Sequence, residues 1–362
     1  MVINVTSIGM FDNTHPALRR CFHPVCRSAD VAEGSIIAVR LLDEDWAIAR
    51  RADGGLMAMA DRCPHRWSPL SAGCVVGNDV QCAYHGYRFG ADGRCTLVPA
   101  LGRTAAIPPK AAVTVAHSVE ERYGLVWMSI EEPLAPIIDV PEWTDPAFTI
   151  CPLPDQNWHA GAAQMVDNFL DLAHFPFTHL ETFGDPDDIE VPQYSVERDG
   201  LGFTCDYRHS TKVLADSMGA ADGFDVAERR SRWWFVAPFA IRLRIDYFAD
   251  DVVLTILFFH QPVDAITTKL YCFDLRNDIA DGRSTAADTV AFQVAVAEED
   301  RALLERVRSK ATPLDLQAEV HTRADRITVE MRRVLRDLVD AADERSPDAA
   351  ATRPLDHAGP DR

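Results

Sequence analysis

The sequence predicts an α+β protein with two domains, a small all-β domain followed by a larger domain that mixes sheet and helix. The chain has 362 residues, which suits two domains better than one. Short strand-like runs fill residues 35–128, and helical spacing is found only after a proline-rich stretch at residues 133–141. We therefore expect a first domain over residues 1–140 and a second over residues 141–344. A tail rich in Pro, Ala, Asp and Arg, residues 345–362, is expected to be disordered.

The expected strands of the first domain are apolar runs bounded by turn signals. Asp53-Gly54 and Asp92-Gly93 are dipeptides that commonly form turns. Four runs with the length and composition of strands lie around them, at residues 35–42, 46–50, 56–60 and 124–128. The first domain is therefore expected to contain only β structure.

The second domain is expected to combine helices with a sheet. Apolar residues recur at helical spacing in three segments. The expected helices cover residues 162–173, 286–307 and 316–342, and the last of them carries an apolar stripe of Val320, Ile327, Val334 and Leu338. The expected strands cover residues 232–262, with a hairpin turn at residues 249–251.

Composition excludes several classes of partner. The formal net charge is −19, from 55 acidic and 36 basic residues, so the surface repels nucleic acid and anionic membranes. Such a surface would suit a basic redox partner without requiring one. No long apolar stretch that could span a membrane and no signal peptide are found, so a cytoplasmic location is expected. With nine cysteines in a reducing compartment, metal ligation is more plausible than a disulfide framework.

The first candidate metal site is a pair of Cys-His motifs, Cys63-x-His65 and Cys82-x-x-His85. A Rieske [2Fe–2S] cluster needs two thiolates on one iron and two imidazoles on the other. A structural zinc site could use the same residue types, but a zinc finger pairs Cys with Cys and His with His. The order Cys-His then Cys-His, within a β domain, favours the cluster. Two other cysteines nearby fit no ligand spacing and are expected to be small buried hydrophobes, Cys74 and Cys95.

The second candidate metal site lies in the segment DNFLDLAHFPFTH, residues 167–179. Asp171 and His174 are three residues apart, so we expect them on one face of a helix, where Asp171 would orient His174. Pro176 is expected to end that helix and let His179 turn back toward the same metal. Two imidazoles, one carboxylate and open positions are what a ferrous centre needs to bind dioxygen.

The third iron ligand must come from elsewhere in the chain. The segment AEEDRALLERVR, residues 297–308, offers Glu298, Glu299 and Asp300 on an expected helix. We favour Asp300, although helical spacing alone does not decide among the three acids. A solvated helix face is the alternative for this acidic cluster.

Candidates for a substrate pocket are few. We consider four residues as pocket contacts: Asn168, Phe259, His260 and Phe292. Core packing is the alternative for the phenylalanines and for His260, and helix capping is the alternative for Asn168. A strand at residues 242–247 places its charged residues on one face, where either a charged substrate or solvent could meet them.

Taken together, these residues resemble the Rieske non-haem-iron oxygenases over about residues 20–340. The resemblance is carried by the segments RCPHRWSPLSAG, QCAYHGYRFGADGRCTLVPA, ERYGLVWMS, DNFLDLAHFPFTH, QPVDAITTK and EEDRALLERVR. Within the family, the chain is similar to the vanillate and dicamba O-demethylases, toluenesulfonate methyl-monooxygenases and methylxanthine N-demethylases.

The resemblance implies a fold and a set of ligands. It implies an all-β Rieske domain followed by a helix-grip catalytic domain, in which an antiparallel sheet wraps helices. The cluster would be bound by Cys63, His65, Cys82 and His85, and a mononuclear Fe(II) by His174, His179 and Asp300. It also implies a homotrimer in which Asp171 bridges the iron of one chain and the cluster ligand His85 of the next.

The resemblance further implies an oxygenase component that uses O2 to hydroxylate a C–H bond of a small aromatic or heterocyclic molecule, with O- or N-demethylation as the favoured outcome. Because no Gly-rich dinucleotide fingerprint is present, electrons from NAD(P)H are expected to arrive through a separate reductase or ferredoxin. Ring or aliphatic hydroxylation and oxidative cyclisation are alternative outcomes at the same iron. An electron-transfer protein without oxygenase activity is the alternative of another class.

Overall fold

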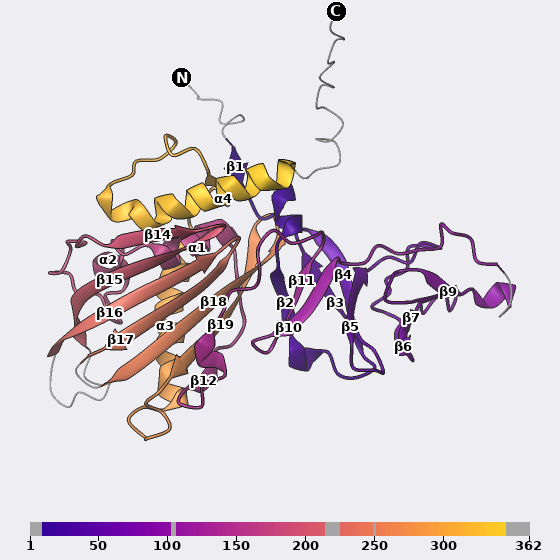
Figure 1. Ribbon diagram of the computed structural model, residues 1–362, viewed down its shortest axis with the longest axis horizontal. Helices are drawn as coiled ribbons and strands as arrows, with labels where there is room; N and C mark the ends of the chain where they lie inside the picture. The colour runs from indigo at the N-terminus through magenta and orange to yellow at the C-terminus, as the bar shows by residue number, and fades with distance from the viewer. Residues whose placement is uncertain (1–8, 103–105, 214–224, 249–250, 345–362) are drawn as a thin grey trace, which may run out of the picture.

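The computed structural model describes residues 9–102, 106–213, 225–248 and 251–344, and Figure 1 shows two parts side by side. The expected tail and most of the expected hairpin turn at residues 249–251 lie outside the described residues. Within the described part of the chain, no helix is long and apolar enough to cross a membrane.

The first part is built from three small antiparallel sheets. The first contains β2 (His23–Arg27), β10 (Ser118–Arg122) and β11 (Leu125–Ser129), and the second contains β3 (Ile36–Leu41), β4 (Glu44–Arg50) and β5 (Leu56–Ala60). The third contains β6 (Cys74–Val76), β7 (Asp79–Gln81), β8 (Arg88–Phe89) and β9 (Cys95–Leu97). The strands expected from sequence agree with β3, β4, β5 and β11 to within one or two residues, and the β character of this part is confirmed.

The second part is a large antiparallel sheet with helices against it. Its strand order is β12-β19-β18-β17-β16-β15-β14, and β13 also pairs with β19. The strands are β12 (Thr149–Pro152), β13 (Gln156–Trp158), β14 (Ser195–Asp199), β15 (Gly202–Val213), β16 (Asp225–Val236), β17 (Ala240–Tyr247), β18 (Val252–Asp264) and β19 (Thr267–Arg276). Figure 1 shows α3 (Ala286–Leu304) crossing behind the sheet, while α4 (Arg326–Glu344) lies along its β14–β15 edge. The α+β fold class is confirmed.

The helix boundaries differ from the expected ones for local reasons. The helix expected at residues 162–173 is α1 (Ala162–Leu170), which ends when the backbone becomes extended at Asp171. The helix α3 ends at Leu304, three residues before the expected end. The last helix begins at Arg326 rather than at residue 316, after a short 3₁₀ turn in which the Thr322 hydroxyl accepts from the N–H of Ala324. Val320 therefore lies outside the helix, 93% exposed.

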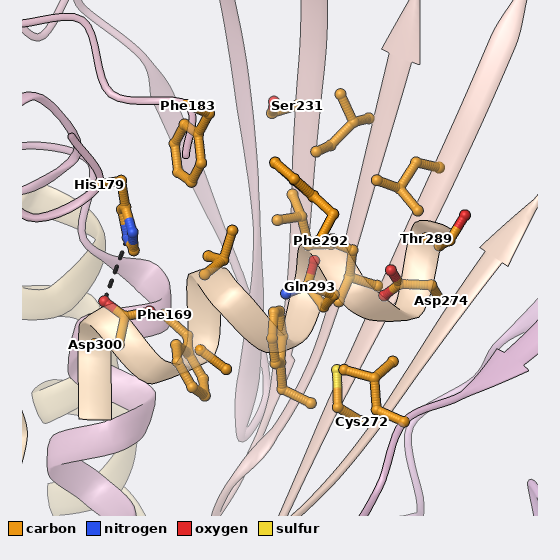
Figure 2. Close-up of a pocket in the computed structure, with 18 of the residues that line it drawn as sticks. Phe169, His179, Phe183, Ser231, Cys272, Asp274, Thr289, Phe292, Gln293 and Asp300 are labelled. Carbon is orange, nitrogen blue, oxygen red and sulfur yellow. Dashed lines mark ion pairs between the residues drawn. The ribbon is translucent and has the colours of Figure 1, made fainter. Parts of the chain in front are cut away.

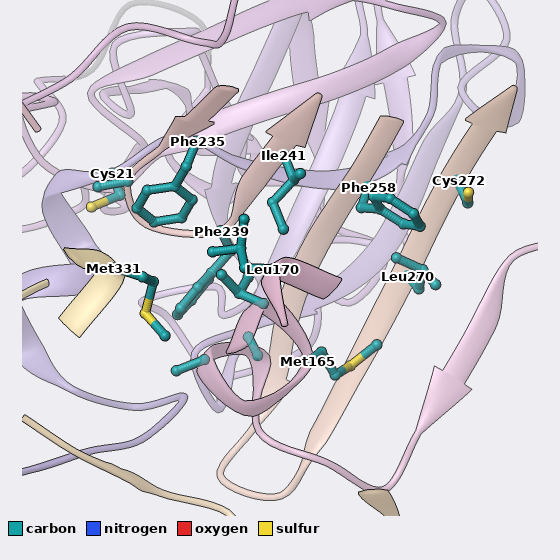
Figure 3. Close-up of a cluster of buried hydrophobic side chains, with 14 of the residues drawn as sticks. Cys21, Met165, Leu170, Phe235, Phe239, Ile241, Phe258, Leu270, Cys272 and Met331 are labelled. Atoms are coloured by element: carbon teal, nitrogen blue, oxygen red, sulfur yellow. The ribbon is translucent and has the colours of Figure 1, made fainter. Parts of the chain in front are cut away.

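A shared hydrophobic core joins the two parts. Figure 3 shows Met165 of α1 and Met331 of α4 among side chains of the large sheet, with Cys21 of the first part nearby. Two backbone hydrogen bonds also connect the parts, from Leu42 N to Pro262 O at 2.8 Å and from Asp43 N to Val263 O at 3.0 Å. The large sheet is therefore fixed to the first part at the end of β18.

The N-terminal segment also contacts the second part. Its strand β1 (Met10–Phe11) pairs with β20 (Thr312–Pro313). The amide nitrogen of buried Asn13 donates to the Thr268 hydroxyl at 3.0 Å, and its amide oxygen accepts from the backbone N–H of Ala162 at 2.8 Å. Asn13 thus satisfies one of the free N–H groups at the start of α1.

Candidate active site

The candidate iron site is formed around a helix of one turn. His174 lies immediately before α2 (Phe175–Thr178) and His179 immediately after it, while Asp300 projects from α3. The two Nε2 atoms are 3.1 Å apart, and Oδ1 of Asp300 lies 3.5 Å from Nε2 of His174 and 3.3 Å from Nε2 of His179. Figure 2 shows His179 and Asp300 facing each other at one end of a cavity. The structure therefore brings together the three residues singled out from sequence.

The local backbone at this site differs from the expected single helix. Asp171 is not on a helical face with His174, because α1 ends at Leu170 and the backbone then becomes extended. The Asp171 carboxylate instead accepts from the backbone N–H groups of Ala173 and His174, both at 3.1 Å. Pro176 does not end a helix but lies in the first turn of α2, where its missing N–H is tolerated.

A carboxylate holds the outer nitrogen of each imidazole. Oδ2 of Asp171 lies 2.9 Å from Nδ1 of His174, and Oε2 of Glu299 lies 2.9 Å from Nδ1 of His179. Because a carboxylate only accepts, each Nδ1 carries the proton and each Nε2 presents a lone pair. Two lone pairs and the buried Oδ1 of Asp300, which has no hydrogen-bond donor among the described residues, then converge on one point. The two lone pairs and the carboxylate oxygen repel one another. A ferrous ion bound by two imidazoles and one carboxylate would balance this repulsion.

The charges at the site agree with this donor set. Burial alone would raise the pKa of Asp300, but the adjacent imidazoles of His174 and His179 outweigh it and lower the pKa to about 2. Burial alone would lower the pKa of His174, but Asp171 and Asp300 outweigh it and raise the pKa to about 9. A metal cation and a proton therefore compete for Nε2 of His174.

The three neighbouring acids of α3 have different surroundings. Asp300 is 3% exposed and faces the histidines. Glu299 lies beside His179 and also accepts from the hydroxyl of Thr182 at 2.6 Å. Glu298 contacts Arg301 at the surface, 3.3 Å away. The role of Glu299 could not be predicted from sequence, because the loop that carries Thr182 folds back onto α3 only in the tertiary structure.

The candidate cluster site lies on two loops, one that connects β5 to β6 and one that connects β7 to β8. The side chains of Cys63 and Cys82 are buried, at 1% and 2% exposure, whereas His85 is exposed and His65 is half-buried, with their ring centroids 4.4 Å apart. Two buried sulfurs beside two adjacent imidazoles fit a histidine-ligated [2Fe–2S] cluster. Cys74 and Cys95 differ from the expectation, since Cys74 is exposed and Cys95 is only half-buried.

The two loops share one backbone pattern. The N–H of Trp67 donates to Cys63 O at 2.9 Å, and the N–H of Gly86 donates to Cys82 O at 3.0 Å. Both donors have positive φ, 59° at Trp67 and 69° at Gly86. The left-handed conformation is unusual for a tryptophan, and its position four residues after the cysteine in both loops indicates that the site requires this turn.

A cavity of about 140 Å³ extends from the candidate iron site along α3. Its volume is comparable to that of a cavity that holds a benzene molecule. Most of its wall is apolar, including Phe169, Phe183, Trp233, Leu243, Ile256, Phe258 and Phe292. Figure 2 shows three of them, Phe169, Phe183 and Phe292, beside α3.

The cavity corrects part of the expected pocket. Asn168 and Phe292 line it, but Phe259 and His260 do not. Phe259 points to the opposite face of the sheet because side chains alternate along β18, and Phe258 takes the expected place. His260 is buried beyond the end of the cavity, where its Nδ1 lies 2.7 Å from the carbonyl oxygen of Phe239.

The charged residues of the strand at 242–247 also lie outside the cavity. Arg242 and Arg244 contact Glu142 on the opposite face of the sheet, at 3.0 and 3.2 Å. Leu243 and Ile245, which alternate with them, line the cavity. The outer-face interpretation therefore agrees with the structure, although a loop partly covers that face.

Polar residues missed by the sequence analysis occur along the same cavity. Thr289, Gln293, Ala297 and Asp300 recur three or four residues apart on α3 and are all buried, so they share one helix face. With a rise of about 1.5 Å per residue, Gln293 lies about 10 Å from Asp300 along the helix axis. Asp274 of β19 also lines the cavity. A single acid on a strand gives no sequence signal that distinguishes a cavity from solvent.

Comparisons with known proteins agree with this geometry. Residues 158–341 match the vanillate O-demethylase oxygenase C-terminal domain, and residues 21–109 match the Rieske [2Fe-2S] domain. The methylxanthine N1-demethylase NdmA of Pseudomonas putida is 31% identical over 91% of this chain and 91% of the relative. The toluene-4-sulfonate monooxygenase system iron-sulfur subunit TsaM1 of Comamonas testosteroni is 29% identical, over 51% of this chain and 53% of the relative.

Solved structures show the same fold. The NdmA structure with caffeine has a TM-score of 0.78 at 30% identity and covers 92% of this chain and 94% of that chain. Dicamba monooxygenase bound to dicamba has a TM-score of 0.74 at 20% identity, over 91% of this chain and 99% of that chain, and supports the fold alone.

Proposed function

The chain belongs to the Rieske non-haem-iron oxygenases, and from this premise we propose that it removes an O- or N-methyl group from a small aromatic or heterocyclic molecule. The observation that carries the proposal is the convergence of His174, His179 and Asp300 at the end of an apolar cavity. The relatives named as demethylases support methyl groups as the target.

We assign the cofactors of this family to two sets of residues. The cluster would be held by Cys63, His65, Cys82 and His85, and the mononuclear iron by His174, His179 and Asp300. When bound, the cluster supplies single electrons and the iron activates dioxygen for insertion of one oxygen atom into a C–H bond.

The residues that line the cavity would position the substrate and exclude water from it. The aromatic side chains of Phe169, Phe258 and Phe292 line a cavity that suits a flat ring. A methyl group directed at the histidines would gain one oxygen atom, while the second oxygen atom leaves as water with two electrons and two protons. A hydroxymethyl group on oxygen or nitrogen then breaks its C–O or C–N bond and leaves as formaldehyde, which gives the demethylated product.

Electrons are proposed to come from NAD(P)H through a separate reductase or ferredoxin. The sequence has no dinucleotide-binding fingerprint. One relative is named as the iron-sulfur subunit of a monooxygenase system, which supports a division of labour between chains.

We propose further that the chain acts as a homotrimer. Figure 1 shows β7, beside one cluster loop, and α2, beside the iron ligands, at opposite ends of the molecule, which supports electron transfer between chains rather than within one. Large apolar side chains are exposed beside both sites: Trp67 at 69%, Tyr84 at 64%, Phe177 at 67% and Leu180 at 56%. Such surfaces are typical of protein interfaces. In this arrangement Asp171, which is part-buried behind His174, would receive His85 of the next chain.

The test combines metal analysis with a substrate panel. Purified protein should contain about three iron atoms per chain, two in the cluster and one mononuclear. With a surrogate reductase and NADH, methoxy- and N-methyl-substituted aromatic compounds should yield formaldehyde and the demethylated product in equal amounts, and His179→Ala should yield neither. Hydroxylated ring products without formaldehyde would overturn demethylation, and about two iron atoms per chain would favour an electron carrier.

A further inference from the structure

Building on the proposed function, we propose that Asp274, with Thr289 and Gln293, binds a nitrogen-borne hydrogen of the substrate at the cavity end remote from the iron ligands. The substrate would then be an N–H-bearing heterocycle or an amine rather than an aromatic carboxylate or sulfonate.

Asp274 interrupts an apolar row of the sheet. Its register neighbour on β18 is Ile256, and the row continues through Leu243 of β17 to Trp233 of β16. All four side chains line the cavity. An isolated carboxyl group among apolar neighbours lowers the stability of the fold unless it gains a partner. Packing therefore gives no reason for an acid at this position.

No protein group within the described residues hydrogen-bonds the Asp274 side chain. The residue is 1% exposed, and its Oδ1 has no hydrogen-bond partner. The nearest charge, Arg276, gives Nε and Nη2 to Asp278 at 2.8 and 2.7 Å. Burial raises the pKa of Asp274 to about 8, against the lowering effect of Arg276. At neutral pH the carboxyl group is therefore largely protonated, and it offers a donor beside an acceptor.

The α3 residues complete a polar end of the cavity. Figure 2 shows Asp274 and Thr289 at the side of the cavity opposite His179 and Asp300, with Gln293 between the two ends. The Thr289 hydroxyl donates to the carbonyl oxygen of Thr285 at 2.8 Å and so presents its lone pairs. A carboxyl group, a hydroxyl acceptor and a primary amide match the N–H and carbonyl edges of a lactam or imide ring.

Two arginines also line the cavity, and Arg276 is paired with Asp278, so Arg229 is the main competing recognition group for an anion. It lies on β16, three strands away from β19, which corresponds to about 14 Å across the sheet. Its Nε contacts Nε2 of His209 at 2.6 Å. Burial and the charge of Arg229 lower the pKa of His209 to about 3, so the imidazole stays neutral and does not balance the positive charge of Arg229. An anionic substrate would use Arg229 and would leave Asp274 without a partner.

The experiment measures binding to the purified holoenzyme by calorimetry and formaldehyde release with a surrogate reductase. The probes are an N-methylated lactam or imide that keeps one ring N–H, its fully N-methylated analogue, a methylated alkylamine and methoxybenzoate. Wild type should bind the N–H lactam at least 10-fold more tightly than both the N-methylated analogue and methoxybenzoate. Tightest binding of methoxybenzoate, lost in Arg229→Gln, would overturn the proposal.

Two variants of Asp274 and one control separate recognition from folding. Asp274→Leu should weaken N–H lactam binding about 10- to 100-fold and leave the N-methylated analogue nearly unchanged. Asp274→Asn keeps a donor and an acceptor, so a neutral lactam should still bind within a few-fold, whereas a cationic amine should be lost. Glu298→Gln, at a surface acid of α3 that does not line the cavity, is the control and should change neither. Equal weakening of all probes by Asp274→Leu, in protein with an intact cluster spectrum, would contradict the proposal.

The two proposals fail separately. If binding depends on Asp274 but no probe yields formaldehyde, the demethylation proposal is rejected and the recognition role of Asp274 is retained. If methoxybenzoate yields formaldehyde and neither Asp274→Leu nor Asp274→Asn changes the yield, demethylation is retained and the recognition role of Asp274 is rejected.

Discussion

Among single residues, Glu299 and Asp171 hold the two imidazoles in the same way, and their replacements are expected to differ. We expect Glu299→Gln to lower the affinity for mononuclear iron about 10- to 100-fold, because Nδ1 of His179 loses its charged acceptor. Iron content and cluster absorbance measured together check this, since the cluster should be unaffected. The control is Glu298→Gln, which alters only a surface contact with Arg301 and should retain full iron. Equal iron content in the two variants would show that Glu299 does not orient the ligand.

For Asp171 we expect a loss of electron transfer rather than of metal. The part-buried carboxylate of Asp171 lies between His174 and the proposed interface. Asp171→Asn keeps the shape and an acceptor oxygen, so it should keep its cluster and most of its iron. In a single turnover with substrate and dioxygen, oxidation of the reduced cluster should slow at least about 10-fold. Fast cluster oxidation with normal product yield would rule out the relay role.

The residues that sequence could reveal are those whose chemistry needs a fixed local spacing. The pairs Cys63/His65 and Cys82/His85 each lie within one loop, and His174 and His179 flank one helical turn. The role of Glu299, which sequence offered only as an alternative iron ligand, and the position of Asp274 were missed because their partners, a folded-back loop and a cavity, exist only in three dimensions.

Among the secondary-structure elements, α1 depends on a residue far away in the sequence. Asn13→Ala removes the acceptor of the Ala162 N–H and the donor to Thr268, both buried. We expect a loss of about 1–3 kcal/mol in the free energy of unfolding, measured by urea titration followed by circular dichroism. Asn157→Ala, at an exposed position of β13, should change it by less than about 0.5 kcal/mol. Equal effects of the two substitutions would show that Asn13 does not stabilise the start of α1.

The difference between local signals and contacts to other segments explains which element boundaries were predicted correctly from sequence. Strands with turn dipeptides beside them, such as β5 after Asp53-Gly54, agree with the structure because the signal is local. The end of α1 at Leu170 and the start of α4 at Arg326 were predicted incorrectly. Apolar spacing continues past both points, while Asp171 and Thr322 bind backbone N–H groups that change the chain direction.

For the whole molecule, the proposed trimer leads to a complementation experiment. Cys82→Ala chains should lack a functional cluster and His174→Ala chains a functional iron, so each parent should be inactive. After denaturation-free subunit exchange at equal concentration, about one quarter of the interfaces would join an intact cluster to an intact iron. Formaldehyde release near a quarter of the wild-type rate is therefore expected. Mixed trimers, verified by mass, that remain inactive would contradict electron transfer between chains.

At this scale, sequence indicated the two parts and their order but not how they are joined. The backbone bonds from Leu42 and Asp43 to the end of β18, and the pairing of β1 with β20, involve segments far apart in the chain. Neither carries a motif, because backbone groups pair whatever the side chains are.

The single helix α3 also has a consequence for regiochemistry. It carries the proposed iron ligand Asp300 and the polar residues Gln293 and Thr289 on one continuous face. Because a helix does not stretch, the separation of these groups is constant at about 1.5 Å per residue. A molecule anchored at its polar end would present to the iron only the methyl group at the matching distance. Chemically equivalent methyl groups on one ring system would then be distinguished by their distance from the anchor, and lengthening or shortening α3 by one turn would change which of them is removed.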